Sequence, residues 1–295
     1  VIDTSGFFPR MVKASAELLA PSVRQYVFIS SISVYKDTSV PNYDESATLA
    51  TLTDPSVEEF GKDFANYGGG KALCEKAAEA AMPGRVTNVR AGYIVGPRDT
   101  SGRFIYWPLR ASLGGAMIVP GRPADPIQII DVRDLADWIV HCIEGNVVGA
   151  FNATGPAKEL SMKSFVQGVG KGVGTSPTLT FIDDAFLKEQ KIGEEQFPLY
   201  APPSGETAGF HRCNIGRALV VPRQPCTVRG PDALCHEEDG SGQERDEVHH
   251  HVARIVERQA DVDRAECRGE GGGPERADHA RPQLAATRAS MMRGR

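Results

Sequence analysis

The sequence predicts an α/β protein built on a doubly wound parallel sheet, and three observations support this class. Short apolar runs typical of strands alternate with helical patterns over the first half of the chain, and this alternation favours a parallel sheet. A tyrosine and a lysine four residues apart, Tyr67 and Lys71, open one of the predicted helices directly after a strand and a loop. The composition changes at about residue 221, so we expect a folded region followed by a tail of different character.

The bulk composition is that of an ordinary soluble protein. Of the 295 residues 41% are apolar, the mean hydropathy is -0.28, the net charge is -5 and the pI is about 5.9. An acidic balance argues against a general partner of nucleic acid or of anionic membranes. No apolar run approaches the roughly 20 residues that span a bilayer, and no signal peptide is recognised. The six cysteines show no Cys-x-x-Cys spacing, which predicts reduced thiols and a cytoplasmic protein.

The first elements follow in order. Residues 1–6 have the pattern of a strand end and a turn, and because the chain begins inside an element without Met we expect a fragment. Residues 9–20 begin with Pro and carry apolar positions at helical spacing, which predicts a helix. Residues 25–31 are the next strand. Residues 36–66 are long, polar and proline-containing, which predicts a loop over the mouth of a site.

The next helix is expected over residues 67–82, ended by Pro83-Gly84. Its first turn holds three glycines, Gly68, Gly69 and Gly70, each costing about 1 kcal/mol relative to Ala. They leave room for a cofactor ribose or only weaken the helix, and we favour the second interpretation.

The remaining folded elements alternate in the same way. Residues 86–95 are expected to form a strand, and Asp131 is expected to cap a helix with an apolar stripe that runs to Ile143. The other expected elements are strands at 150–154 and 178–182, a helix at 161–169, a helix capped by Asp183, and a proline-rich crevice loop at 197–210. We therefore expect a first domain over 1–150, a smaller subdomain over 151–220 and a tail over 221–295.

The tail from residue 221 has a composition that cannot bury much surface. No aromatic residue follows Phe210 and no lysine follows Lys191, so disorder is the default expectation. The abrupt change near Leu219 also suggests a shift of reading frame. The run His249-His250-His251 is not interpreted as a metal site, because no pairs at ligand spacing accompany it.

Tyr67 and Lys71 lie one turn apart on one helix face. An ammonium so placed would lower the pKa of the phenol from about 10, and such a phenol can exchange a proton at a carbonyl or alcohol carbon. The hydroxyl of Ser31, at the end of the apolar strand, would bind the same substrate oxygen. The alternative is a solvated helix face, which is less favoured because the serine-rich run lies upstream in the expected order. The combination indicates alcohol–carbonyl interconversion beside a nicotinamide.

Two further runs, 88–97 and 129–136, complete a set of four motifs with 30–35 and 67–71. Together these motifs resemble the extended short-chain dehydrogenase/reductases, the NAD-dependent epimerase/dehydratase family, and the resemblance covers residues 1–219. It implies a Rossmann-like sheet, here incomplete because the Gly-rich first strand and turn are not in the sequence. We expect three preceding strands to be absent, and the choice between NAD and NADP cannot be inferred.

The resemblance also assigns roles to residues. Tyr67 would be the acid/base, Lys71 would lower its pKa and hold the nicotinamide ribose, and Ser31 would orient the substrate oxygen. The expected cofactor, NAD or NADP, would contact Thr4, Ser5, Gly6, Ser30, Tyr67, Lys71, Tyr93, Ile94 and Val95. The expected substrate contacts are Ser33, Arg98, Arg103, Trp107, Arg122 and Gln128. As alternatives, residues 3–6 are an ordinary turn, each arginine is a solvated surface charge, and Arg90 is a salt-bridge partner.

The substrate remains open between three alternatives. A nucleotide-sugar epimerase or dehydratase is the family's commonest activity, but an Arg and a His that many relatives carry near residues 125–131 are replaced here. This loss favours a reductase of a non-nucleotide carbonyl compound, and a non-catalytic scaffold is the third alternative.

For the chain as it stands we predict low or absent activity, no metal, and by analogy a homodimer through the helices at 9–20 and 67–82. The glycines of 168–174 are not interpreted as a phosphate loop, because they follow a helix and precede a strand.

Overall fold

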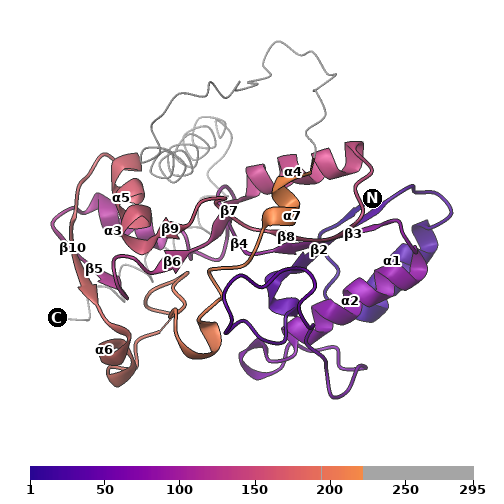
Figure 1. The fold of residues 1–295 in the computed structure, drawn as a ribbon, viewed down its shortest axis with the longest axis horizontal. Helices are drawn as coiled ribbons and strands as arrows, with labels where there is room; N and C mark the ends of the chain where they lie inside the picture. Colours follow the sequence, from indigo (N-terminus) through magenta and orange to yellow (C-terminus); the bar gives the residue numbers. More distant parts are fainter. Residues whose placement is uncertain (194, 222–295) are drawn as a thin grey trace, which may run out of the picture. The chain divides into compact units, whose positions relative to one another are not determined.

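The computed structural model describes residues 1–193 and 195–221, and it centres on a parallel sheet of four strands in the order β1-β2-β3-β8 (Figure 1). The strands are β1 (Ile2–Asp3), β2 (Tyr26–Ser31), β3 (Val86–Ala91) and β8 (Gly149–Ala153). Ser31 pairs with Ala91, and Ala91 pairs with Ala153. The carboxyl ends of the three longer strands therefore meet at one edge. The expectations for the tail lie outside the described residues.

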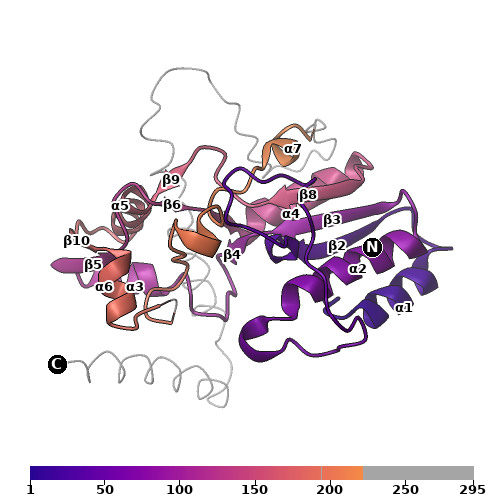
Figure 2. The same cartoon turned by 60° about the horizontal axis from the view of Figure 1, so that its bottom comes forward.

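Helices cover both faces of this sheet, so the doubly wound α/β prediction is confirmed (Figures 1 and 2). Helices α1 (Pro9–Leu19) and α2 (Tyr67–Ala81) pack on one face, where Tyr26 and Phe28 of β2 meet apolar residues of both helices. Helix α4 (Val132–Glu144) packs on the other face, against Val27. Successive β2 side chains thus point to opposite faces, as the period of two in a strand requires.

The strand expected over residues 86–95 is divided into two. β3 ends at Ala91, and β4 (Tyr93–Val95) leaves the main sheet and pairs in parallel with β7 (Ile129–Asp131). The division falls at Gly92, whose backbone lies so close to Thr154 that a Cβ there would overlap the threonine side chain. Periodicity along the sequence does not reveal this approach, because Thr154 is distant in the chain.

A second hydrophobic core surrounds the fully buried Trp107. Its elements are α3 (Tyr106–Ser112), β5 (Ala116–Pro120), β6 (Pro126–Ile127), β9 (Leu160–Ser161), α5 (Met162–Gly172), β10 (Thr178–Ile182) and α6 (Asp184–Glu189). β5 pairs in parallel with β10, and β6 pairs antiparallel with β9. The core therefore draws on residues from both sides of position 150, while β8 belongs to the main sheet. The boundary expected at 150 does not coincide with the division between the two cores.

Three predicted helix starts are capped by the side chain of the residue before them. Asp131, Ser161 and Asp183 accept hydrogen bonds from the backbone N–H groups of Arg133, Ser164 and Phe186. Each cap satisfies one of the free N–H groups at a helix start. Gly168 and Gly170 lie buried in the last turns of α5, so this glycine-rich run belongs to a helix end and not to a turn between strand and helix.

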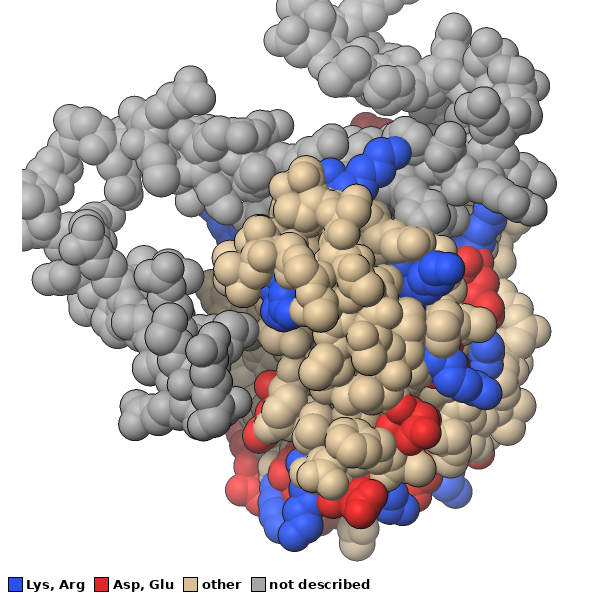
Figure 3. Space-filling view, turned by 90° about the vertical axis from the view of Figure 1, so that its left-hand side faces the viewer, with Lys and Arg blue, Asp and Glu red and all other residues tan. Residues whose placement is uncertain are grey.

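The face turned to the viewer in Figure 3 carries both signs of charge, with Lys and Arg lying among Asp and Glu and no large patch of a single sign.

Short 3-10 turns occur at η1 (Ile32–Val34), η2 (Lys62–Phe64) and η3 (Gly205–Thr207), and the described chain closes with α7 (Gly216–Leu219). Trp138 of α4 donates its indole N–H to the carbonyl of Ala218, which fixes α7. None of the helices described combines the length and the apolar run that a bilayer crossing requires.

Candidate functional site

Ser31 and Tyr67 meet at the carboxyl end of β2. Ser31 is the last residue of β2, and its Oγ accepts a hydrogen bond from the backbone N–H of Ser33 at 3.1 Å, which starts η1. Tyr67 is the first residue of α2, and the Ser31 hydroxyl lies close enough to its phenol to lower the pKa of that phenol. Ser31 and Tyr67 belong to separate motifs in the sequence, and the fold brings them close together in space.

Gly68 explains how the start of α2 comes so near to η1. A Cβ on Gly68 would overlap the carbonyl oxygen of Ser33, whereas a Cβ on Gly70 would meet no atom within 4 Å. Our preference for glycines that only weaken the helix is therefore wrong for Gly68, which permits a close backbone approach. This approach brings the first side chain of α2 to the end of β2.

Lys71 lies one turn further along α2 and is 4% exposed. Its Nζ donates to the carbonyl oxygens of Gly6 at 2.9 Å and Ile29 at 2.6 Å. The ammonium also lies 4.4 Å from the centre of the Phe28 ring and 5.4 Å from that of Phe7. The cation is therefore enclosed between β2 and the turn after β1, and does not point into bulk solvent.

Burial decides the proton affinities in this cluster. It raises the pKa of the Tyr67 phenol, with the Ser31 hydrogen bond and the positive charge of Arg103 acting in the opposite direction. It lowers the pKa of Lys71, opposed by the neighbouring acidic groups Asp3 and Glu75. We expected Lys71 to lower the pKa of the phenol, and the structure differs: the net shift is upward, and the opposing cation is Arg103.

An aromatic wall borders Tyr67, and the sequence analysis missed it. The rings of Phe60 and Phe64 lie edge-on to Tyr67 at 5.9 and 6.4 Å between ring centres. Phe60 also contacts Phe7 and Phe8, at 5.9 and 5.6 Å. The sequence signal was two pairs of phenylalanines, Phe7 with Phe8 and Phe60 with Phe64. The second pair lies in the segment 36–66, which was interpreted as a polar loop.

The same segment is tied to α1 by an ion pair. Arg10 donates to both carboxylate oxygens of Glu58, at 2.7 and 2.9 Å. Part of the loop expected over residues 36–66 therefore packs against the cluster that contains Tyr67.

The residues expected to bind the cofactor separate into two groups. Gly6 contacts Lys71, and Thr4 and Ser5 lie exposed at the carboxyl end of β1. The hydroxyl of Ser30 donates to Glu75 at 2.6 Å in a buried contact, so this hydroxyl is engaged inside the protein and not at a cofactor surface.

Tyr93, Ile94 and Val95 form β4, next to β7. Ile94 packs in the core beneath α4 and Val95 packs in the second core. Their side chains are thus used for packing, and a contact of this strand with a cofactor would involve main-chain atoms, as expected.

The residues expected to bind substrate are only partly brought together. Arg103 lies near Tyr67 and 5.1 Å from the centre of the Tyr93 ring. Ser33 lies beside Ser31, with 3.1 Å between their hydroxyl oxygens. Arg98 is exposed, and the side chain of Arg122 is 73% exposed and paired with Asp125.

Two of the expected substrate residues are structural instead. Trp107 is fully buried and donates its indole N–H to the carbonyl of Pro198 at 2.9 Å. The amide of Gln128 donates to and accepts from the backbone of Cys213, both at 3.0 Å. These hydrogen bonds occupy the indole N–H of Trp107 and one donor and one acceptor position of the Gln128 amide.

His211 is a further residue that sequence reasoning missed. Its Nδ1 accepts the backbone N–H of Gln128 at 3.0 Å, so Nε2 carries the proton and donates to the carbonyl of Leu199 at 3.0 Å. Burial lowers the pKa of this imidazole to about 4. His211 therefore holds three segments together as a neutral side chain, and nothing in its sequence context indicates this.

Two hollows lie away from the Tyr67 cluster. One, of about 610 Å³, is lined by residues of α5 and the turn before β10, including Gln167, Lys171 and Thr175. The other, of about 390 Å³, is lined by Asp44, Glu45, Ser46, Asn214 and Arg217. Within residues 1–193 and 195–221, no group of three His, Cys, Asp or Glu side chains is placed to hold a metal ion.

Comparison with known proteins gives matches only at the level of structure. No family model matches the sequence, and no curated protein matches it either. A provisionally assigned epimerase from Burkholderia cenocepacia J2315 superposes with a TM-score of 0.51 at 16% identity, covering 87% of this chain and 69% of that one. The human epimerase family protein SDR39U1 with NADPH gives 0.49 at 18% identity, covering 84% and 73%. UDP-glucuronic acid 4-epimerase from Bacillus cereus with NAD gives 0.45 at 18% identity, covering 70% and 63%.

The similarity to the Burkholderia protein establishes the fold. The chain shares the α/β fold of that protein, and its doubly wound parallel sheet is the one that the sequence predicted. At 16% identity the likeness concerns the arrangement of elements, and the chemistry has to be argued from the site itself.

Proposed function

We propose that this chain belongs to an NAD(P)-dependent oxidoreductase or epimerase that acts at a carbon carrying a hydroxyl or carbonyl oxygen. The observation that carries the proposal is the contact of Ser31 with Tyr67, one turn before a buried Lys71. A phenol and a serine hydroxyl that lie close together can both bind one substrate oxygen. A bound nicotinamide would supply or accept the hydride.

In this mechanism Tyr67 transfers the proton and Ser31 orients the substrate oxygen. A phenol with an ordinary pKa of about 10 is protonated at neutral pH, and burial raises the pKa of Tyr67 further, so it can donate a proton to a carbonyl oxygen during reduction. The positive charge of Arg103 stabilises the phenolate left behind. In the oxidative direction the same groups act in reverse.

Lys71 suits the ribose end of the cofactor. An ammonium has three N–H donors, and carbonyl oxygens of Gly6 and Ile29 receive two of them. The third can donate to a ribose hydroxyl at the carboxyl end of the sheet, where ligands bind in open α/β folds. The described residues hold no Gly-rich turn between a strand and a helix for the pyrophosphate, so the fit concerns only the nicotinamide half.

The substrate class follows from the charge beside Tyr67. Arg103 would attract a phosphate or carboxylate near the reacting carbon, which supports a nucleotide sugar or a related anionic substrate. The second candidate is a reductase of a non-nucleotide carbonyl compound. It is favoured by Gln128, an expected substrate contact whose amide is instead hydrogen-bonded to the Cys213 backbone. A non-catalytic scaffold is the outcome if no nicotinamide binds.

The proposal is tested by titrating the protein with NADH and with NADPH and following the nucleotide fluorescence. We expect binding of at least one nucleotide, loss of that binding in Lys71→Met, and retention in the control Lys76→Met, which alters an exposed lysine of the same helix. Circular dichroism shows whether Lys71→Met remains folded. If the unaltered chain binds neither nucleotide, the function proposed for it is refuted.

By analogy with the family that the sequence motifs resemble, we propose a homodimer in which α1 takes part. Met11 and Leu18 of α1 are 44% and 78% exposed, although both are large and apolar. Such side chains are favoured at an interface between subunits. Light scattering of the unaltered chain and of Met11→Glu/Leu18→Glu distinguishes a dimer through α1 from a monomer.

A further inference from the structure

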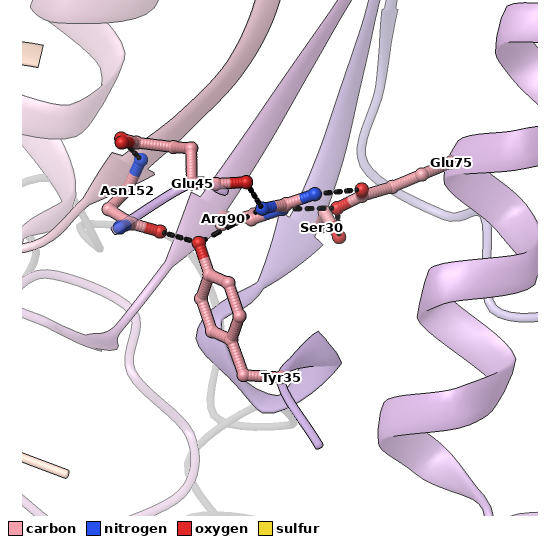
Figure 4. A network of polar contacts seen from close by, with 6 residues as sticks. All are labelled: Ser30, Tyr35, Glu45, Glu75, Arg90 and Asn152. Atoms are coloured by element: carbon pink, nitrogen blue, oxygen red, sulfur yellow. Dashed lines mark hydrogen bonds and ion pairs between the residues drawn. The ribbon is translucent and has the colours of Figure 1, made fainter. Parts of the chain in front are cut away.

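Glu75 of α2 and Arg90 of β3 form a buried ion pair that the proposed chemistry does not use (Figure 4). Nε of Arg90 donates to Oε1 of Glu75 at 3.0 Å, and Nη2 donates to Oε2 at 2.8 Å. The side chains of Arg90 and Glu75 are 5% and 6% exposed. Both charges are therefore almost completely removed from water.

Stability alone is a poor reason for such a pair. Removing two ions from water costs several kcal/mol, and a buried pair replaced by well-packed apolar residues often leaves stability unchanged or increased. The neighbouring positions of α2 at Cys74 and Ala78 are filled by small apolar residues in a closed core. A buried ion pair in this setting is better explained by a role in fixing the position of α2 against the sheet.

The position of Glu75 on the helix indicates which geometry this is. Tyr67, Lys71 and Glu75 follow one another at intervals of four residues, so they share one face of α2. All three meet the end of β2: the Ser31 hydroxyl lies close to the Tyr67 phenol, the Ile29 carbonyl accepts from Lys71, and the Ser30 hydroxyl donates to Glu75.

Three successive strand residues thus lie against three successive turns of the helix, and two of them, Ile29 and Ser30, are hydrogen-bonded to it. A slip of α2 by one residue would turn this face by about 100° and move it by about 1.5 Å. Such a slip would separate every one of these pairs.

The other end of the pair is fixed by the sheet. Nη1 of Arg90 donates to the Tyr35 hydroxyl at 2.9 Å and to the Glu45 carbonyl at 3.2 Å. The Tyr35 hydroxyl in turn donates to Asn152 of β8 at 2.5 Å. Figure 4 shows this chain of contacts running from α2 across β3 to β8. All three guanidinium nitrogens are engaged, so the carboxylate of Glu75 meets a partner that cannot readily move.

We infer that Glu75 and Arg90 are positioning residues, whose ion pair sets the rotation and depth of α2 so that Tyr67 meets Ser31 and Lys71 meets Gly6 and Ile29. The inference rests on the proposed function for its chemical meaning. The placement that it assigns can nevertheless be measured without cofactor or substrate.

The decisive variant is Glu75→Met/Arg90→Met, which removes the pair without leaving one charge buried alone. The readout is the titration of the Tyr67 phenol, followed by NMR of tyrosine labelled with ¹³C at Cζ and assigned with Tyr67→Phe. In the unaltered protein Ser31→Ala should raise the pKa of Tyr67, because the Ser31 hydroxyl lowers it. In the double variant we expect Tyr67 to titrate nearer to 10, the value of a solvated tyrosine, and Ser31→Ala to have no further effect.

The matched control is Lys13→Gln/Glu17→Gln, which removes an exposed ion pair of α1 with side chains 62% and 53% exposed. It should leave the coupling between Ser31 and Tyr67 intact. If the double variant is folded and keeps that coupling, the pair is merely structural and the inference is overturned. If the double variant does not fold, Ser30→Ala and Glu75→Gln are measured instead, and the absence of any shift in the Tyr67 titration overturns it equally.

Activity gives an independent readout if the chain proves to be catalytic. A catalytic group misplaced by about 1 Å can cost on the order of 100-fold in rate, so we expect kcat of the double variant to fall at least about 10-fold with KM little changed. A protein that binds neither NADH nor NADPH refutes the proposed function, whereas the NMR titration still decides the positioning role.

Discussion

The carbonyl oxygen of Ser33 lies against Gly68 so closely that a methyl group on Gly68 would overlap it. This contact joins the 3-10 turn after β2 to the first turn of α2. It leads to the first of four predictions.

Gly68→Ala should push the first turn of α2 away from η1. We expect a loss of about 1–3 kcal/mol in the free energy of unfolding, the usual cost of overpacking, together with a separation of Tyr67 from Ser31. Gly70→Ala is the matched control in the same turn, where a Cβ meets nothing within 4 Å, and it should be neutral or stabilising by up to about 1 kcal/mol. Urea unfolding measures both variants, and equal effects would contradict the close approach.

Tyr67→Phe should abolish proton transfer while preserving the helix. Any carbonyl reduction should slow by about 10²–10⁴-fold. Nucleotide binding should persist, since Lys71 is untouched. Tyr106→Phe, a half-buried tyrosine of α3, is the control, and a Tyr67→Phe protein with unaltered turnover would exclude the phenol as the acid/base.

His211 should make stability depend on pH in a defined window. Burial lowers its pKa from 6.5 to about 4 in the folded protein, so below pH 6.5 the unfolded chain takes up a proton that the folded chain resists. The free energy of unfolding from this residue is thus fully present above pH 6.5 and falls by roughly 3 kcal/mol as the pH drops towards 4.

Urea unfolding at several pH values between 4 and 7.5 measures this dependence. His211→Gln should flatten the pH profile in that window, at the cost of lower stability at pH 7.5. His141→Gln, on α4, controls for the loss of a histidine. An unchanged profile in His211→Gln would show that the imidazole is not buried as the hydrogen bonds to Gln128 and Leu199 require.

Arg103 should influence the ionisation of Tyr67 through its charge. Because the arginine opposes the effect of burial, Arg103→Gln should raise the pKa of the phenol further. Arg122→Gln removes a largely exposed guanidinium that is paired with Asp125, and it should leave the pKa of Tyr67 unchanged. The ¹³C titration of Tyr67 compares the two variants, and equal curves would place Arg103 too far from the phenol to act on it.

The sequence by itself determined the local elements of this protein. The strand at 178–182 and the helix starts after Asp131, Ser161 and Asp183 agree with prediction. The reason is that helix caps, alternation and the four-residue spacing of Tyr67 and Lys71 depend on neighbours within one or two turns. Periodicity therefore sufficed to place Tyr67 and Lys71 on one face and to predict the doubly wound class.

Only the tertiary structure decided what surrounds those residues. It buried Trp107, bound Gln128 to Cys213, joined Glu75 to Arg90 and set Arg103 over the ring of Tyr93. Each of these contacts joins segments that no local pattern connects. The pKa of the phenol followed burial and not the nearest lysine, since the free energy of a charge depends on everything packed around it.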